Sequence, residues 1–111
     1  MAAAKDFRSA WILLLLLSGS NYGYELRRAL SDRALSLDPA VMYRTLRDME
    51  HAGFIASRWT RSEAGPRRHV YDITKAGRTE LVRFATAISD ARDAHSTFLD
   101  AFEQATAGRK N

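Results

Sequence analysis

The chain has 111 residues, with 17 lysines and arginines against 13 aspartates and glutamates, and it contains no cysteine. This length predicts one domain with a modest core, and the missing cysteines exclude disulfides, thiol catalysis and zinc–thiolate sites. Residues 1–78 hold 13 basic and 8 acidic residues (+5), whereas residues 79–111 hold 4 and 5 (−1). A basic body favours a polyanionic partner, nucleic acid before an anionic membrane. We expect a cytoplasmic protein.

The first predicted helix covers residues 5–17 and contains an apolar run from Ala10 to Leu17. This run is far shorter than the stretch of about 20 residues that spans a bilayer, so we expect no membrane partner. So many leucines in succession instead predict a helix that is buried on most of its faces. The small residues Ser18 to Ser20 end the helix.

The second predicted helix covers residues 22–30. Ser20 or Asn21 is expected to cap its first turn, because short polar side chains accept hydrogen bonds from the free N–H groups there. Apolar side chains at spacings of four predict a buried stripe, made of Tyr22, Leu26 and Leu30.

The third predicted helix covers residues 39–52 and has strong signals at both ends. Asp38 suits the N-cap and Pro39 the first helical position. Gly53 stands where a glycine commonly ends a helix. The buried stripe of this helix is predicted to be Met42, Leu46 and Met49.

A β-hairpin is predicted next, because residues 55–61 and 67–73 are rich in β-formers and flank a turn at residues 62–66. That turn length gives the facing pairs Arg61/Arg67, Trp59/His69, Ser57/Tyr71 and Ile55/Ile73. Facing like charges destabilise a hairpin. Phosphate binding would explain why two arginines stand at the tip.

The last predicted helix covers residues 75–107, with Thr74 as its cap. It carries residues at alternating spacings of three and four, namely Leu81, Phe84, Ile88, Ala91, His95, Phe98, Phe102 and Ala105. This is the a/d seam of a coiled coil, in which His95 would set the register. A single small domain cannot cover a seam on a helix roughly 50 Å long. We therefore expect a homodimer that pairs this helix; packing on the first helix is the alternative.

Three helices followed by a hairpin are the element order of a winged helix-turn-helix. The expected fold is mainly α with a small β-hairpin, formed by a DNA-binding domain at residues 1–74. A long C-terminal dimerisation helix at residues 75–107 and a disordered tail at 108–111 complete the expected organisation.

In this fold the third helix enters the major groove and the hairpin, or wing, contacts the backbone or minor groove. Arginine reads guanine, and a small side chain can meet the thymine methyl group. The predicted contacts on the third helix are Ala40, Val41, Tyr43, Arg44, Arg47 and His51; those on the wing and its flank are Tyr24, Arg58, Arg61, Gly65, Arg67 and Arg68. The alternative for Arg44 and Arg47 is a solvated face paired with Asp48 and Glu50.

Three motifs also resemble those of the PadR family of transcriptional regulators, and they come in the family's order. They are Tyr22-Gly23-Tyr24-Glu25-Leu26; Pro39 to Leu46 leading to the segment Glu50 to Ile55; and Gly65 to Gly77. The resemblance covers roughly residues 10–80 and implies a homodimeric winged-helix regulator, usually a repressor, that dimerises through its C-terminal helix and sometimes answers a small-molecule inducer. It places Tyr43 and Arg44 at the DNA-facing start of the recognition helix. Ala40-Val41 departs from the family's small polar residues, which affects base preference.

Three other functions are alternatives for this sequence. No motif of an enzyme is present, since the three histidines fall on different elements. A metal-responsive repressor of the ArsR type would need a second histidine after Asp93-Ala94-His95, at the position that Thr106 occupies, so we expect no metal or other cofactor. A winged helix that binds protein stays open, and the wing arginines argue against it.

A small-molecule effector is a further predicted partner, beside the pseudo-palindromic operator DNA. Aromatic side chains on the first and last helices, Phe7, Trp11, Phe98 and Phe102, would line its pocket. The alternative is that these aromatic side chains belong to the core.

Overall fold

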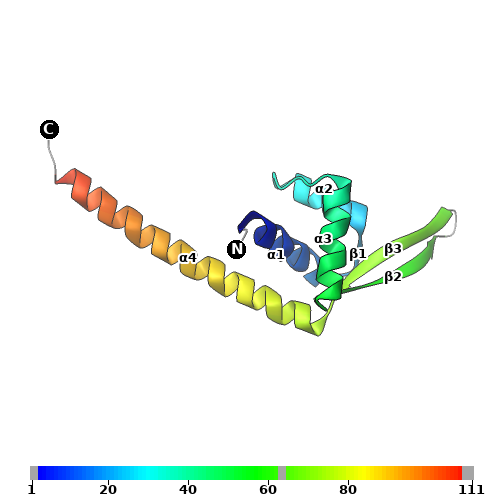
Figure 1. Cartoon of the computed structure of the whole chain (residues 1–111). Coiled ribbons are helices and arrows are strands. Elements are labelled where there is room, and N and C mark those ends of the chain that lie inside the picture. Colours follow the sequence, from blue (N-terminus) through cyan, green and yellow to red (C-terminus); the bar gives the residue numbers. More distant parts are fainter. Residues whose placement is uncertain (1–2, 63–64, 109–111) are drawn as a thin grey trace. The chain divides into compact units, whose positions relative to one another are not determined.

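The computed structural model describes residues 3–62 and 65–108 (Figure 1). The elements in this part of the chain are α1 (Ala3–Leu17), β1 (Asn21–Tyr22), α2 (Gly23–Ser31), α3 (Pro39–His51), β2 (Ile55–Ser62), β3 (Gly65–Ile73) and α4 (Lys75–Ala107). They divide into two compact units, Met1–Leu81 and Val82–Asn111. The predicted fold class is confirmed, because three helices, a hairpin and a long final helix follow in the expected order.

Helix α1 packs through one face only. Ala10, Ile12, Leu13 and Leu16 are buried, a spacing that gathers them on one side of a helix. Phe7, Leu14 and Leu17 are exposed. The expectation of a helix buried on most of its faces is therefore wrong for the single chain, because only the side that meets the neighbouring elements is covered. In the described part of the chain, no helix is both long and apolar enough to cross a membrane.

A two-residue strand that the sequence did not predict precedes α2. Asn21 and Tyr22 pair with Tyr71 and Val70 of β3. The expected cap from Ser20 or Asn21 is wrong, since Tyr22 is the N-cap of α2 and makes no side-chain cap bond. The amide oxygen of Asn21 instead accepts a 2.8 Å hydrogen bond from the Tyr22 backbone N–H. The stripe of α2 is confirmed for Leu26 and Leu30, which are fully buried, while Tyr22 is half-buried.

Helix α3 follows its sequence signals closely. The Asp38 side chain accepts a 3.0 Å hydrogen bond from the Val41 backbone N–H, and Gly53 after the helix adopts a φ of +86° that suits glycine. Ala52 is the C-cap, so the helix ends one residue before the predicted end. The predicted stripe is buried at Met42, Leu46 and Met49, which leaves the opposite face of α3 to the solvent.

The three strands form an antiparallel sheet in the order β1-β3-β2. The predicted pairs Ile55/Ile73, Ser57/Tyr71 and Trp59/His69 are confirmed, but the register shifts between Thr60 and Ser62, and Ser62 lies opposite Gly65. Arg61 and Arg67 are therefore no regular pair. A bulge of this kind adds a residue to one strand and interrupts the regular pairing there. The strands also run further than predicted, to Ser62 and from Gly65, so the five-residue turn is wrong; residues 63–64 lie outside the described residues.

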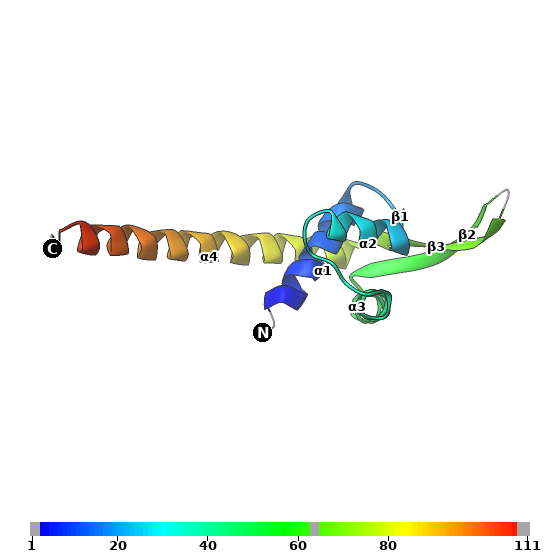
Figure 2. The ribbon, with the colours of Figure 1, turned by 90° about the horizontal axis from the view of Figure 1, so that it is seen from above.

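The two faces of the hairpin meet different neighbours. Seen from above, α3 lies on one side of the hairpin and β1 with α2 on the other (Figure 2). The Ser57 hydroxyl reaches the Glu50 carboxylate of α3 at 2.8 and 3.0 Å. Because side chains alternate along a strand, the α3 face carries Ser57, Trp59, Arg67, His69 and Tyr71, and the opposite face carries Arg58, Thr60, Arg68, Val70 and Asp72.

Helix α4 has the predicted bounds. The Thr74 side chain caps it, accepting a 3.0 Å hydrogen bond from the Gly77 N–H. The first compact unit ends at Leu81, so the first turns of α4 belong with the winged helix, seven residues past the predicted boundary at residue 74. Of the tail predicted at 108–111, only Gly108 is among the described residues.

Candidate nucleic-acid interface

The outer face of α3 presents the predicted stripe to solvent. Ala40, Arg44, Arg47 and His51 are all exposed, Val41 is half-buried and Tyr43 is exposed at its edge. Neither Arg44 nor Arg47 forms an ion pair with any described residue. Pairing of these arginines with Asp48 and Glu50 is therefore not seen among the described residues, whereas the alternative of a solvated face stays open.

Tyr43 lies against the first residue of α2. A Cβ atom at Gly23 would come within 2.8 Å of the Tyr43 Cε1 and 3.1 Å of its hydroxyl oxygen, which is closer than real Cβ atoms approach. Gly23 is therefore small because the Tyr43 ring occupies the space beside it. This contact places the Tyr43 ring of α3 beside the first residue of α2.

Three rings form a stack along the α3 face of the hairpin, which we call the wing stack: Trp59, His69 and Tyr71. The ring centroids of Trp59 and His69 are 4.5 Å apart at 8°, and those of His69 and Tyr71 are 4.8 Å apart at 43°. The Tyr71 hydroxyl lies 3.2 Å from Nδ1 of His69. Tyr71 is buried, whereas Trp59 is 59% exposed. The stack therefore holds a solvent-exposed indole in a fixed place beside α3.

Burial raises the pKa of the Tyr71 phenol above its ordinary value, and the neighbouring Tyr43 and Glu50 add to the rise. The positive charge of Arg47 opposes this rise. At neutral pH the phenol keeps its proton and can donate it toward His69. The stack and the α3 stripe thus adjoin each other.

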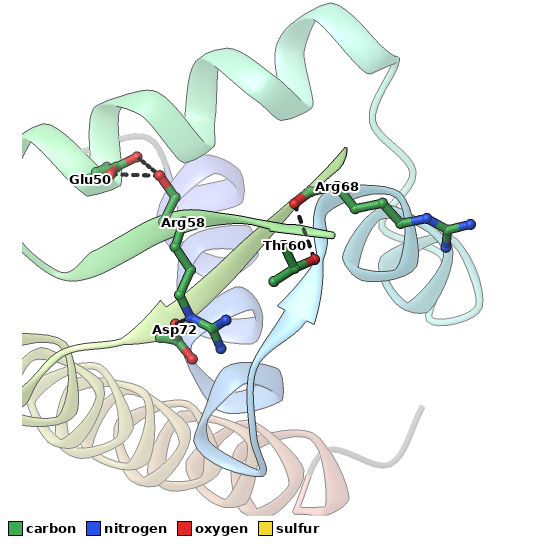
Figure 3. A network of polar contacts seen from close by, with 6 residues as sticks. Glu50, Arg58, Thr60, Arg68 and Asp72 are labelled. Carbon is green, nitrogen blue, oxygen red and sulfur yellow. Dashed lines mark hydrogen bonds and ion pairs between the residues drawn. The ribbon is translucent and has the colours of Figure 1, made fainter. Parts of the chain in front are cut away.

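Arg68 lies on the opposite face, where it joins the start of α2. Its Nη1 donates a 2.8 Å hydrogen bond to the Tyr24 hydroxyl, and its guanidinium lies 5.5 Å from the Tyr22 ring centroid. Figure 3 shows the Arg68 side chain leaving the hairpin toward α2. The Tyr22 and Tyr24 rings are stacked at 5.6 Å. The structure thus brings together two predicted contacts, Tyr24 and Arg68, and adds Tyr22.

The other predicted wing residues do not form one cluster. Arg58 lies on the face away from α3 and its Nε is 3.3 Å from an Asp72 carboxylate oxygen (Figure 3). Arg61, Gly65 and Arg67 are exposed toward the end of the hairpin. Arg58 is therefore already neutralised in part, and the exposed arginines at the far end of the wing are better placed for an outside anion.

Several of the predicted dimerisation residues on α4 are exposed apolar side chains, as are Val82 and Leu99 off the predicted seam. Phe98 and Phe102 are 66% and 55% exposed, with ring centroids 6.5 Å apart. Ile88, Ala91 and His95 are also exposed, and Leu81 and Phe84 are half-buried. Of the predicted effector residues, Phe7 is exposed and Trp11 is half-buried beneath the Arg33 guanidinium, 4.8 Å from its ring centroid.

No three histidine, aspartate or glutamate side chains come together to hold a metal ion within residues 3–62 and 65–108. Sequence reasoning missed three residues of this surface, Tyr22, Trp59 and His69. The hairpin register already placed Trp59 opposite His69, so that signal was available. Nothing local in the sequence connects Tyr22 with the wing or α3.

Solved structures share this architecture. A protein of Thermoplasma acidophilum, described as a candidate transcriptional regulator, is 27% identical with a TM-score of 0.78 over 90% of this chain and 97% of its own. A PadR family transcription regulator of Clostridium difficile is 26% identical, with a TM-score of 0.77 over 84% and 98% of the two chains. Bacillus subtilis PadR in complex with operator DNA is 26% identical, with a TM-score of 0.63 over 71% of this chain and 46% of that one.

Curated protein sequences give no match to this chain. The model of the PadR-like family of transcriptional regulators, in contrast, matches residues 12–83. The matched segment runs from the buried face of α1 through the recognition helix and the hairpin to the first turns of α4. The family match, the winged-helix fold and the exposed basic stripe of α3 agree, and the chain belongs to the PadR-like family of transcriptional regulators.

Proposed function

We propose that two copies of this chain bind a pseudo-palindromic operator in double-stranded DNA and repress transcription there. Helix α3 enters the major groove, and the α3 face of the hairpin follows the adjoining backbone. The observation that carries this proposal is the exposed stripe of Ala40, Arg44, Arg47 and His51 beside the wing stack. The contacts expected from the sequence at Val41, Tyr43, Arg61, Gly65 and Arg67 lie on exposed or half-exposed positions that suit this docking.

The exposed seam of α4 supports the homodimer. Ile88, Phe98 and Phe102 leave apolar surface in water, and burying such surface is worth about 25 cal/mol per Å². A two-fold interface brings the same residues of both copies together. It also supplies a second recognition helix, which must lie about 34 Å from the first to meet the next major-groove turn.

Repression follows from occupancy, since a dimer lying across a promoter excludes other proteins from the same DNA. The Bacillus subtilis relative was solved with operator DNA, which supports a similar role here. Because the DNA of a promoter is inside the cell, the proposed place of action is the cytoplasm. The effector pocket of Phe7, Trp11, Phe98 and Phe102 stays a prediction.

Selection of DNA from a random pool by the purified protein tests the proposal. We expect an inverted repeat whose half-site centres are about 10 base pairs apart, or a multiple of that. Binding should also weaken steeply between about 50 and 200 mM salt, because bound phosphates release counterions. A pool that shows no enrichment, with weak dependence on salt, would favour the protein-binding winged helix instead.

Replacing Arg44 by alanine should relax base preference at one position of each half-site. The expected cost on the selected operator is about 1–3 kcal/mol, because a bidentate arginine–guanine contact is lost. Competition titrations with operators mutated base by base measure both effects. An Arg44→Ala protein that keeps the full preference of the wild type would show that Arg44 does not read a base.

Replacing Arg67 by alanine should weaken binding to all sequences alike and reduce the salt slope by about one, as expected for a phosphate contact. Arg58→Ala is the matched comparison on the other face of the same hairpin, where Asp72 already pairs with the guanidinium. Titrations of both variants with operator DNA over a salt series show which face of the hairpin contacts phosphate. Equal loss of slope in both variants would mean that the α3 face is not the one that contacts DNA.

Trp59 should report DNA directly. The chain has 2 tryptophans, so Trp11→Phe leaves the exposed indole of the wing stack as the only one. We expect operator DNA to quench this fluorescence, because the indole passes from water to the surface of the duplex. Trp59→Phe, which leaves Trp11, is the control and should change little. If operator DNA bound the Trp11→Phe protein without changing its fluorescence, Trp59 would not lie at the DNA interface.

A further inference from the structure

A small cavity of about 200 Å³ lies beside the recognition helix and has no role in the surface described so far. It is lined by Arg8 of α1, by Leu37 of the loop before α3, and by Val41, Arg44, Thr45 and Asp48 of α3. Two of these residues, Val41 and Arg44, belong to the face of α3 that is proposed to meet DNA. The cavity therefore brings Arg8 of α1 next to residues of α3 that are proposed to contact DNA.

Arg8, which lines this cavity, has a buried hydrogen-bond donor without an acceptor. Its Nε is buried and finds no hydrogen-bond partner among the described residues. A guanidinium is always charged, and a buried donor of a charged group without an acceptor costs more than a buried neutral donor does. The hydroxyl of Thr45, which also lines the cavity, donates its own proton to the Val41 carbonyl at 2.8 Å. An oxygen acceptor from outside the chain would satisfy Arg8.

The charges around the cavity indicate what that acceptor is. Arg8 and Arg44 bring two positive charges and Asp48 one negative charge, which leaves one positive charge to be balanced. A phosphodiester group carries a single negative charge and offers two free oxygens, and guanidinium groups bind such oxygens well. Asp48 disfavours an ion with two negative charges. The cavity therefore suits a phosphodiester better than a free dianion.

We propose that Arg8 of α1 binds a backbone phosphate of the operator, at the edge of the groove that Arg44 enters. This proposal rests on the DNA binding proposed above, because it places the phosphate next to the DNA-facing residues Val41 and Arg44. It adds α1 to α3 and the hairpin as a third element that contacts DNA. Arg8 would carry no base specificity, since phosphate contacts position a protein without reading sequence.

Arg8→Gln tests the proposal in the full chain, by fluorescence anisotropy with labelled operator over a salt series. We expect affinity to fall several-fold on every sequence and the salt slope to drop by about one. Arg92→Gln is the matched control, because it removes the same charge from α4, where the Arg92 side chain is 76% exposed. The control should keep the wild-type slope. If the salt dependence of DNA affinity had the same slope in Arg8→Gln and Arg92→Gln, the proposal would be overturned.

Arg8→Lys separates binding from folding, because it keeps the charge. A slope near that of the wild type supports the phosphate contact; a loss as large as in Arg8→Gln, with equal thermal destabilisation, would assign Arg8 a structural role instead. Thermal melts with inorganic phosphate at constant ionic strength form the other arm. Stabilisation of the wild type but not of Arg8→Gln, with an unchanged DNA slope, would assign the cavity to a free anion. Failure of the wild type to bind any selected DNA would overturn the proposed function itself.

Discussion

Replacing Phe98 by aspartate should raise the dissociation constant of the homodimer by a factor of about 10² to 10⁴. Burying a phenylalanine contributes about 1.5–3 kcal/mol, and a two-fold interface loses the contribution of both copies, or about 3–6 kcal/mol in total. Phe98 is the natural position for this test because its ring is 66% exposed and stacks on Phe102 within the same helix. The aspartates would also face each other at low dielectric across the seam.

Loss of the dimer should remove most of the affinity for the operator. Two linked recognition helices bind two half-sites with an effective concentration that is worth about 10²–10⁴ in affinity. Below the dissociation constant of the variant, only single half-sites are occupied. Sedimentation equilibrium gives the dimer constant, and anisotropy at the same protein concentrations gives the DNA affinity.

Ser96→Asp is the matched control for Phe98→Asp. Ser96 is exposed on the same helix, two residues away and off the seam, so the added charge is the same but the proposed interface is not touched. Circular dichroism should show equal helix content in both variants. A Phe98→Asp protein that sediments as the wild type does would refute dimerisation through the seam.

Most of the elements could be predicted because their signals are local. Asp38 and Pro39 mark the start of α3, Gly53 marks its end, and Thr74 marks the start of α4, and each of them does in the structure what its side chain suggests. A cap or a left-handed turn is decided by a few neighbouring residues. Sequence reasoning is reliable where the physical cause lies within one helical turn.

The errors concern contacts between distant residues. Strand β1 has two residues and no alternating pattern, and it exists because Tyr71 and Val70 present a free strand edge to Asn21 and Tyr22. The same pairing takes Asn21 away from the capping role that its chemistry suggested. At the hairpin, a bulge after Thr60 displaced the predicted Arg61/Arg67 pair. Neither effect is visible in a stretch of sequence read by itself.

The spacing of residues on α3 predicts its exposed face more directly than the hairpin sequence predicts the faces of the wing. The helical stripe follows from spacing, whereas Arg58 and Arg67 were grouped as basic residues although they lie on opposite faces of the hairpin. Alternation along the strands separates them, since Arg58 shares its face with Asp72 and Arg67 shares its face with His69. Arg8 could not be found, because only the packing of α1 brings it to Arg44.

Gly77→Ala should destabilise the winged helix by about 3 kcal/mol, although alanine is the better helix former. In the first turn of α4, a Cβ at position 77 would overlap the Phe54 carbonyl oxygen and come within 2.8 Å of the Ile73 Cγ1. Overpacking costs about 1–3 kcal/mol. The backbone oxygen cannot move aside as the end of a flexible side chain can. Helix propensity alone predicts a gain of roughly 0.5–1 kcal/mol, so the two accounts differ in sign.

The clash would also disrupt the hydrogen bonds that link the turn after α3 to the start of α4. Thr74 donates a 2.6 Å hydrogen bond to the Gly53 carbonyl oxygen while it accepts from the Gly77 N–H. Its own N–H donates to the Phe54 carbonyl oxygen at 3.1 Å. A helix start displaced by the new methyl group loses these bonds, and a lost cap costs about 0.5–2 kcal/mol.

Thermal melts at one fixed protein concentration measure the effect, and a loss of about 3 kcal/mol corresponds to a fall in Tm of roughly 10–20 °C for a unit of this size. Gly108→Ala is the control at the other end of α4, where the nearest atom to a new Cβ is the Gln104 carbonyl oxygen at an ordinary 3.7 Å. That variant should melt within about 0.5 kcal/mol of the wild type. If Gly77→Ala melted higher than the wild type, Gly77 would not be held against the turn after α3.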